Sequence, residues 1–321
     1  MKRLTIHDVA QAAGVSHMTV SRVVRGVRSV AVGTEQKVRA AIEAIGYSPD
    51  PALSALAAYR TNARSPGEHG VLAFLDCDQT EFSRQVMRGA VDEGRLLGYT
   101  IERFPMHQAR AAQVRLSRML FHRGVHGLLF GPSDEAWTFS GWPWEEFAPV
   151  SLGALSHQPR MHKVAIDYFH SAYTACETLW QKGCRRIGFA VDPALDSRTE
   201  HRWLGGYLAV LATKSVPPLR YGGTTSKPQA FKSWARRNKI DGLLTIHAGL
   251  SGELPGTKTV FLNDIEAPPD VPCFQLPPAS IGAEGVRLLH HLLLRREFGL
   301  PAQPKMSALQ GLWREPVSVP S

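Results

Sequence analysis

The feature that most restricts the fold is an alternation of short apolar runs with helical stretches between residues 70 and 294. The apolar runs predict buried strands at 70–75, 127–130, 149–152, 186–190, 242–246 and 259–262. The amphipathic stretches predict helices at 82–97, 109–122, 169–181, 199–212 and 281–294. This alternation is typical of an α/β fold with doubly wound parallel sheets, and its two successive series predict two lobes with a cleft between them.

The composition fits a globular protein with an uneven charge. A chain of 321 residues is long enough for two or three domains, and 44% apolar residues can fill a sizeable core. Lysine and arginine number 37 against 28 acidic residues, a net charge of +9. Residues 1–64 hold nine basic and four acidic side chains, so the excess is densest at the N-terminus. Such a balance fits a polyanionic partner.

Cysteine usage and hydropathy point to the cytoplasm. No C-x-x-C pair occurs among the four cysteines, so we expect reduced, mostly buried thiols. No apolar run approaches the roughly 18 residues of a membrane span. The N-terminal sequence MKRLTIHDVAQ lacks the apolar stretch of a signal peptide. We therefore expect a cytoplasmic protein that does not enter a membrane.

The first 25 residues predict two short helices joined by a tight turn. Thr5 and Asp8 have the spacing of a helix N-terminus, Gly14 ends the first helix, and Ser16 begins the second. Apolar residues recur at helical spacing at Ile6, Val9, Ala10, Ala13, Val20, Val23 and Val24. This is a helix-turn-helix, and a generic helical hairpin is the alternative interpretation.

The outward side of the second helix favours DNA binding over the generic hairpin. His17, Met18 and Arg22 suit base edges, whereas short hydroxyls and arginine beside them suit phosphate oxygens. Thr34 is expected to cap a third helix that ends at Gly46. After it, residues 52–58 are good helix formers but too few to form a helix alone in water, so a helix there needs a partner.

Several motifs carry a resemblance to a known family. They are Thr5-Ile6-His7-Asp8-Val9-Ala10, Ala13-Gly14-Val15-Ser16, Thr19-Val20-Ser21-Arg22-Val23-Val24, Lys37-Val38, Gly46-Tyr47 and Pro49. Together they resemble the signature of the lactose-repressor (LacI/GalR) family of bacterial transcriptional regulators. Weaker landmarks in the second lobe are Asp167, the segment 183–188, Gly206-Tyr207 and Ile281-Gly282.

The resemblance implies roles for individual DNA-binding residues. The residues that read bases in the major groove would be His17, Met18 and Arg22. The residues that hold phosphates would be Thr5, Ser16, Thr19, Ser21, Arg25 and Thr34. Leu56, supported by Leu53, would wedge into the minor groove from a hinge helix. Ordinary packing is the alternative role for Leu56.

We accordingly expect three parts in the chain. A helix-turn-helix domain covers residues 1–48, and a hinge helix with its linker covers 49–68. A two-lobed core resembling periplasmic binding proteins covers 69–321. Its first lobe is expected at about 69–162 and 276–301, and its second, shortened lobe at about 163–275 and 302–321.

The chain departs from the family pattern at two places in the second lobe. Trp203 stands where the family usually has an effector-binding arginine, with Arg202 one position away, and Trp203 can stack on a sugar or belong to the core. Only the segment 247–258, rich in glycine, separates two strands, which leaves little room for a crossover helix. The family's acidic effector ligand is also missing there.

Residues that follow strands are the candidates for the effector cleft. Asp76 and Asp78 can bind ligand hydroxyls or cap a helix, and Asn263 and Asp264 follow the strand 259–262. The full set of candidates is Asp76, Asp78, Arg202, Trp203, His247, Asn263 and Asp264.

We find no catalytic constellation in the sequence. There is no G-x-S-x-G and no H-E-x-x-H, so we expect no enzyme, no cofactor and no metal site. The resemblance implies a regulator, expected to be a repressor, that binds a pseudo-palindromic operator in double-stranded DNA as a homodimer. A small-molecule effector, a sugar being one class, would occupy the cleft. The alternatives are a constitutive architectural DNA binder with a vestigial cleft, and a sugar-binding protein without a role in DNA regulation.

Overall fold

The computed structural model describes residues 6–24, 31–45, 70–155, 157–223, 228–252 and 254–316. The chain divides into two compact units, Met1–Ala63 and Arg64–Ser321. The predicted hinge helix with Leu53 and Leu56 lies outside the described residues. Thr5 and Arg25 also lie outside them.

The N-terminal unit contains the three helices that the sequence predicts. These are α1 (Ile6–Ala13), α2 (His17–Val24) and α3 (Val32–Ile45). Gly14 takes a φ of +63°, a left-handed conformation that suits glycine and ends α1. Val9, Val20 and Val38 are fully buried and join the three helices in one small core.

The prediction that Thr34 caps the third helix is wrong. The helix α3 already begins at Val32, and the amides of Thr34 and Glu35 both donate to the Ala31 carbonyl. Thr34 therefore lies inside the first turn. The Ala31 carbonyl accepts the first helical hydrogen bonds, so the helix begins earlier than the sequence pattern indicates.

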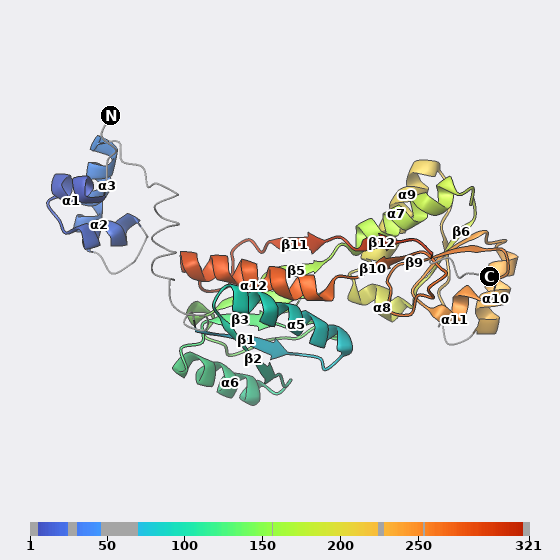
Figure 1. The fold of residues 1–321 in the computed structure, drawn as a ribbon, viewed down its shortest axis with the longest axis horizontal. Helices are drawn as coiled ribbons and strands as arrows, with labels where there is room; N and C mark the ends of the chain where they lie inside the picture. Colours follow the sequence, from blue (N-terminus) through green and yellow to red (C-terminus); the bar gives the residue numbers. More distant parts are fainter. Residues whose placement is uncertain are drawn as a thin grey trace. The chain divides into compact units, whose positions relative to one another are not determined.

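The larger unit contains two sheets in two lobes, as predicted, and each sheet has six strands among the described residues (Figure 1). The first sheet has the strand order β11-β5-β4-β3-β1-β2, and the paired strands are parallel. Its strands are β1 (Val71–Asp76), β2 (Thr100–Pro105), β3 (Gly127–Phe130), β4 (Ala148–Leu152), β5 (His162–Ile166) and β11 (Met306–Leu309). The helices of this lobe are α5 (Glu81–Leu96), α6 (Arg110–His122) and α12 (Pro278–Arg295), with a short 3-10 turn η1 (Trp144–Glu146).

The second sheet has the order β12-β10-β9-β8-β6-β7, with β12 antiparallel to β10. Its strands are β6 (Ile187–Ala190), β7 (Leu219–Arg220), β8 (Gly242–Thr245), β9 (Lys258–Phe261), β10 (Cys273–Gln275) and β12 (Leu312–Arg314). Its helices are α7 (Tyr168–Gln181), α8 (Pro193–Arg198), α9 (Arg202–Lys214), α10 (Pro228–Arg237) and α11 (Ala248–Ser251). Only α11, a single turn, lies between β8 and β9, in agreement with the shortened connection expected there.

The chain crosses between the two sheets three times. It leaves the first sheet after Ile166, returns after Gln275, and crosses again between Leu309 and Leu312. The expected lobe boundaries need correction, because β5 and β11 both belong to the first sheet. Parallel pairing of β11 with β5 brings residues 306–309 beside 163–166, a long-range pairing that local pattern does not encode.

The helices α5 and α12 lie side by side against the first sheet (Figure 1). A Cβ added to Gly282 on α12 would lie 1.9 Å from the Val86 carbonyl oxygen, and one added to Gly89 would lie 1.8 Å from the Ala279 carbonyl oxygen. Both glycines therefore allow backbone contact between the two helices. Among the described helices, none is long and apolar enough to cross a lipid bilayer.

Substitution of Gly282 by alanine should destabilise the larger unit. The added methyl has to displace backbone, and overpacking of this kind costs about 1–3 kcal/mol. Gly249 on α11 is the matched control, because a Cβ there meets nothing within 4 Å. Urea unfolding of the full-length variants measures the difference, and equal midpoints for Gly282→Ala and Gly249→Ala would contradict the close packing.

Candidate functional site

The second helix of the N-terminal unit begins with a side-chain cap. The Ser16 Oγ accepts a hydrogen bond from the Thr19 amide at 3.1 Å and lies 2.9 Å from the Thr19 Oγ1. Such a cap satisfies one of the amides that the first helical turn leaves without a partner. Ser16 and His17 are exposed, so the start of α2 lies at the surface of this unit.

The helix α2 presents a defined outward side. Val20 and Val23 are buried, which fixes the inward side of the helix. The side chains of Met18 and Arg22, two of the three residues predicted to read bases, lie outside the described part of this helix.

The larger unit has a cleft of about 710 Å³ between its two lobes. This volume is within the range of about 300–1,000 Å³ typical of small-molecule sites. The first lobe contributes the segments after β1, β3 and β4, and the second lobe those after β8, β9 and β10. All of these are the carboxyl ends of parallel strands, where ligands of such folds bind.

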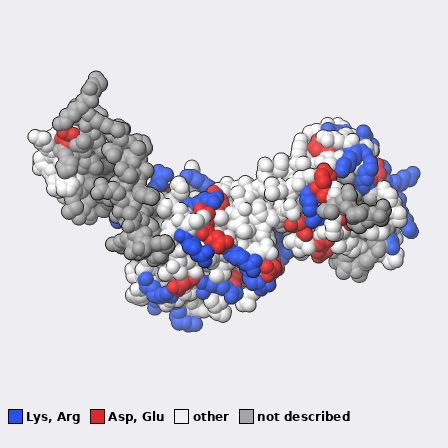
Figure 2. Space-filling model, in the orientation of Figure 1, with Lys and Arg blue, Asp and Glu red and all other residues white. Residues whose placement is uncertain are grey.

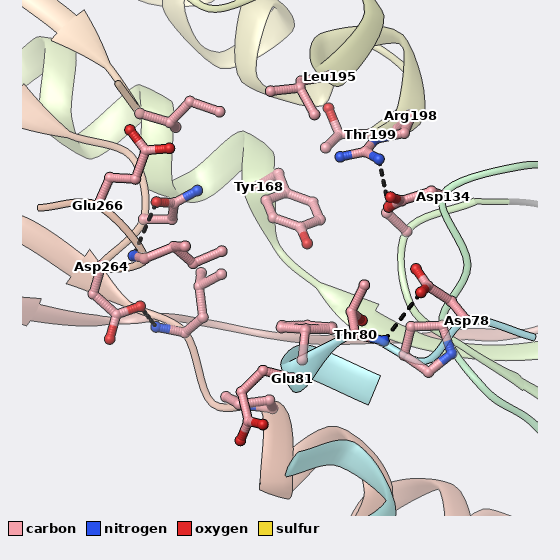
Figure 3. A pocket seen from close by; sticks show the side chains of 18 of the residues that line it. Asp78, Thr80, Glu81, Asp134, Tyr168, Leu195, Arg198, Thr199, Asp264 and Glu266 are labelled. Carbon is pink, nitrogen blue, oxygen red and sulfur yellow. Dashed lines mark hydrogen bonds and ion pairs between the residues drawn. The ribbon is translucent and has the colours of Figure 1, made fainter. Parts of the chain in front are cut away.

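Acidic side chains outnumber basic ones in the lining of the cleft (Figure 3). Among the described lining residues there are five carboxylates and one guanidinium. They are Asp78, Glu81, Asp134, Asp264 and Glu266, with Arg198. Arg198 of the second lobe forms an ion pair with Asp134 of the first lobe. An acidic lining disfavours anionic ligands and offers acceptors for hydroxyl or ammonium groups.

Backbone hydrogen bonds position several of the acidic and amide groups. Asp78 Oδ1 accepts from the Thr80 amide at 3.1 Å, Asn263 Oδ1 from the Ile265 amide at 3.2 Å, and Asp264 Oδ1 from the Leu276 amide at 3.1 Å. Burial, aided by the charge of Asp134, raises the pKa of Asp78 above its usual value. These hydrogen bonds orient the three side chains, all of which line the cleft.

The centre of the cleft is aromatic. The Tyr168 ring lies between the Asp78–Asp134 side and the Asp264–Glu266 side (Figure 3). Its edge meets Trp203 with ring centroids 4.7 Å apart, and burial raises the pKa of Tyr168 to about 12, so the phenol stays protonated. The Trp203 Nε1 is buried and has no hydrogen-bond partner among the described residues.

His247 enters the cleft at the end of β8. Its Nε2 accepts a hydrogen bond from the Asp192 amide at 3.4 Å, which places the ring proton on Nδ1. Burial lowers the pKa of His247, while Glu266 and Asp192 oppose this shift. The ring is therefore expected to be neutral near pH 7.

The structure brings together five of the seven predicted cleft residues. Those that line the cleft are Asp78, Trp203, His247, Asn263 and Asp264. Of the two roles that the sequence left open for Trp203, the structure shows the core role, because the side chain is 4% exposed and packs in the core. Trp203 also lines the cleft.

Asp76 and Arg202 do not belong to this cleft, and their assignment to it is corrected. Asp76 is 6% exposed and accepts hydrogen bonds from Ser83 and Arg103, the latter from Nε at 2.7 Å. It is the last residue of β1, and its side chain belongs to this buried network. Arg202 pairs with Glu200 at 3.0 Å and lines a different cavity.

Sequence reasoning missed the ion pair of Asp134 with Arg198 and the central Tyr168. Asp134 follows β3 just as Asp78 follows β1, so its position after a predicted strand was a usable signal. Arg198 and Tyr168 lie on helices, and only the meeting of the two lobes places them together.

Comparison with known proteins finds similarity to bacterial transcriptional regulators. The family model "Bacterial regulatory proteins, lacI family" matches residues 5–50. Catabolite control protein A of Priestia megaterium is 28% identical over 216 residues, which cover 67% of this chain and 63% of that protein. This chain thus spans less than two thirds of the length of the first curated relatives that it matches.

Solved structures share the fold over nearly the whole chain. The complex of the transcriptional regulator CelR with cellobiose has a TM-score of 0.53 at 19% identity and covers 97% of this chain and 98% of that one. The Lac repressor dimer bound to operator and the anti-inducer ONPF has a TM-score of 0.52 at 16% identity, covering 97% and 98%. Residues 5–50 thus match the LacI family model, and the two-lobed core shares the fold of these solved structures.

Two landmarks of the resemblance have structural roles in the second lobe. A Cβ on Gly206 would lie 2.3 Å from the Phe169 carbonyl oxygen, so glycine lets α9 approach α7. The Tyr207 hydroxyl donates to the Ile187 carbonyl at 2.9 Å and accepts from the Leu219 amide at 2.8 Å, which joins β6 to β7. Asp167 caps α7 by accepting from the His170 amide.

Removal of the cap at α2 should loosen the N-terminal unit. Ser16→Ala leaves the Thr19 amide without its side-chain acceptor, and loss of an N-cap costs about 1 kcal/mol. Hydrogen exchange of the α2 amides in the full-length protein should accelerate about fivefold, which is the change in the opening equilibrium that corresponds to about 1 kcal/mol. Gln11→Ala, at an exposed position of α1, is the control and should leave exchange in α2 unchanged. Equal exchange in the two variants would show that Ser16 does not stabilise α2.

Proposed function

We propose that this chain is a DNA-binding transcriptional regulator, acting as a repressor, whose DNA affinity is set by a small molecule in the cleft. It acts as a homodimer on a pseudo-palindromic operator in double-stranded DNA. The observation that carries this proposal is the match of residues 5–50 to the LacI family model, together with the capped, outward-facing α2.

The charge distribution supports DNA contact through the N-terminal unit. Residues 1–64 carry nine basic and four acidic side chains, whereas the remaining residues carry 28 and 24. On the face seen in Figure 2, basic and acidic side chains are interspersed over both lobes of the core. The small unit therefore has the greater density of positive charge, which strengthens contacts with phosphates.

We assign DNA contacts by position on α2 and its surroundings. His17, Met18 and Arg22 read base edges, and arginine can bind guanine through two hydrogen bonds. Phosphate contacts come from Thr5, Ser16, Thr19, Ser21, Arg25 and Thr34. Residues 49–68 form the hinge, in which Leu53 supports Leu56 in the minor groove.

The chemistry of the cleft supports a neutral polyhydroxylated effector, with sugars as the first class to test. Five carboxylates repel phosphorylated ligands, whereas carboxylate and amide oxygens accept hydrogen bonds from hydroxyls. The buried Trp203 Nε1 has no partner among the described residues and can donate to a ligand oxygen. The similar CelR was solved with cellobiose, which is consistent with this class.

A ligand that spans the cleft would change the angle between the lobes, and thus the spacing of the two hinges in the dimer. Such a ligand shifts the equilibrium only by its difference in affinity for the two lobe arrangements. The ion pair of Asp134 with Arg198 links the two lobes, so a change in the angle between them would alter this contact.

Arg22→Ala should relax sequence preference at one symmetric base pair in each half-site. Loss of a bidentate contact to guanine costs about 1–3 kcal/mol. Selection of bound DNA from a random pool, followed by anisotropy titration at fixed salt, measures both motif and affinity. Arg39→Ala is the control, because Arg39 lies on α3 and pairs with Glu35 at 2.7 Å. An unchanged motif would exclude Arg22 as a base reader, and no preference by the parent protein would reject the proposed function.

A screen of neutral sugars and nucleosides by thermal shift should find a stabilising ligand. Trp203→Phe should then weaken its binding, because the indole N–H can no longer donate to the ligand. Trp142→Phe is the matched control, since Trp142 Nε1 is also buried and has no partner in the described part of the chain, but Trp142 does not line the cleft. Equal affinities in the two variants would remove Trp203 from the site, and no ligand in a broad panel would favour a constitutive DNA binder with a vestigial cleft.

A further inference from the structure

A second cavity, of about 190 Å³, lies where the chain crosses between the sheets. The first lobe contributes residues of β4, β5 and β11, and the second lobe contributes the turn before α9 and its first residue. This cavity is too small for the disaccharide-sized ligands that the main cleft can hold. Its lining differs from that of the cleft in chemistry as well as in size.

The second cavity is basic, in contrast to the acidic cleft. Four cations line it, Arg160, Lys163, Arg202 and Lys305, and among the described lining residues the one carboxylate is Glu200. A net excess of three positive charges is held around a small volume. Such a cluster favours an anion, since clustered like charges are otherwise destabilising.

Ser151 supplies an independent indication of a ligand. This residue lies on the central strand β4, is 2% exposed and lines the cavity. Its Oγ has no hydrogen-bond partner in the described part of the chain. A buried hydroxyl without a partner is costly, and an anionic acceptor in the cavity would satisfy it.

Lys163 and His157 add donors of two kinds. The Lys163 side chain is 10% exposed, donates to the Ala154 carbonyl at 2.9 Å and lies 3.5 Å from Glu200. His157 is 3% exposed and its Nδ1 accepts from the Trp137 amide at 3.1 Å, so the ring proton is on Nε2. Burial, aided by the charge of Lys163, lowers the pKa of His157 to about 4, so the ring is a neutral donor near pH 7.

We propose that this cavity is a second ligand site, which binds a small oxyanion between the lobes through Ser151, His157, Lys163 and the surrounding cations. A phosphate group and a carboxylate share the required chemistry. The proposal goes beyond the DNA and effector binding proposed above and concerns a different ligand class.

The two sites share a wall. Ala154 lines the acidic cleft, and its carbonyl accepts the hydrogen bond from Lys163 of the basic cavity. Thr199 and Trp203 line the cleft on either side of Glu200 and Arg202, which line the cavity. An oxyanion would compete with Glu200 for Lys163, and would thereby change a contact between the first lobe and the start of α9.

Isothermal titration calorimetry of the full-length protein tests the proposal directly. Inorganic phosphate and succinate are titrated separately at constant ionic strength, and saturable binding of either one is the expected result. The stronger binder identifies the source of the oxyanion. Absence of saturable binding by both would overturn the proposal.

Three variants locate the binding site. Ser151→Ala should weaken binding about tenfold, as expected for loss of a hydrogen bond to a charged group. Arg160→Gln with Lys305→Gln should weaken it further, whereas Arg115→Gln with Arg118→Gln makes the same charge change on exposed α6 positions and should leave binding unchanged. Glu200→Gln should strengthen binding, because it removes the competing carboxylate.

The pattern across these variants decides the outcome. Equal affinities for the parent protein, Ser151→Ala and Glu200→Gln would place any anion binding elsewhere and overturn the proposal. Thermal unfolding of each variant without anion serves as the folding check. The midpoint of Ser151→Ala is expected to equal or exceed that of the parent, because the variant removes a buried hydroxyl that has no partner among the described residues. The calorimetry uses no DNA and no sugar, so failure of the regulator proposal leaves its result unaffected.

Discussion

The constraint on which the larger unit depends is that parallel strands of both sheets end toward one cleft. In the first lobe, Asp78 and Asp134 follow β1 and β3, and in the second lobe His247 and Asn263 follow β8 and β9. The three crossings between the sheets hold the two sets of strand ends face to face. Side chains from distant parts of the chain therefore meet in one cavity without any of them lying close in sequence. Binding capacity in this arrangement resides in loops, whereas the sheets behind them supply rigidity.

Much of the fold could be predicted from local pattern, because central strands are continuous apolar runs. All five residues of β4 and all four of β3 are buried, and both segments were predicted. The strand β2 was missed because it lies at the edge of the sheet. Its residues are exposed or half-buried, so its sequence mixes polar and apolar residues and has no continuous apolar run. The two-residue β7 and the terminal β11 and β12 form only by pairing with strands far away in sequence. These strands therefore depend on tertiary pairing more than on local propensity.

The sequence also predicted those site residues whose position depends on local pattern, and it missed those that depend on contacts between distant segments. Asp78 and Asp264 come shortly after predicted strands and line the cleft, because strand ends face it. Asp76 was wrong since the last residue of a strand can still point into the sheet interior, where Ser83 and Arg103 bind it. Arg198 and Tyr168 could not be assigned, as their contribution depends on how the second lobe meets the first. The base-reading positions of α2 rest on the pattern of Val20 and Val23 and on the family resemblance.

Two cavities of opposite charge lie on the two sides of one interlobe wall. The acidic cleft can accept hydroxyl or ammonium groups, and the basic cavity can accept an oxyanion, so a single ligand would not suit both. Lys163 is central to this arrangement, since it contacts Ala154 on the cleft side and Glu200 on the second lobe. Because interfaces between packed lobes have discrete arrangements, a contact exchanged at Lys163 favours one lobe arrangement over another. A cell could then combine two chemically distinct signals in one change of lobe angle, provided that each ligand binds the two arrangements with different affinity.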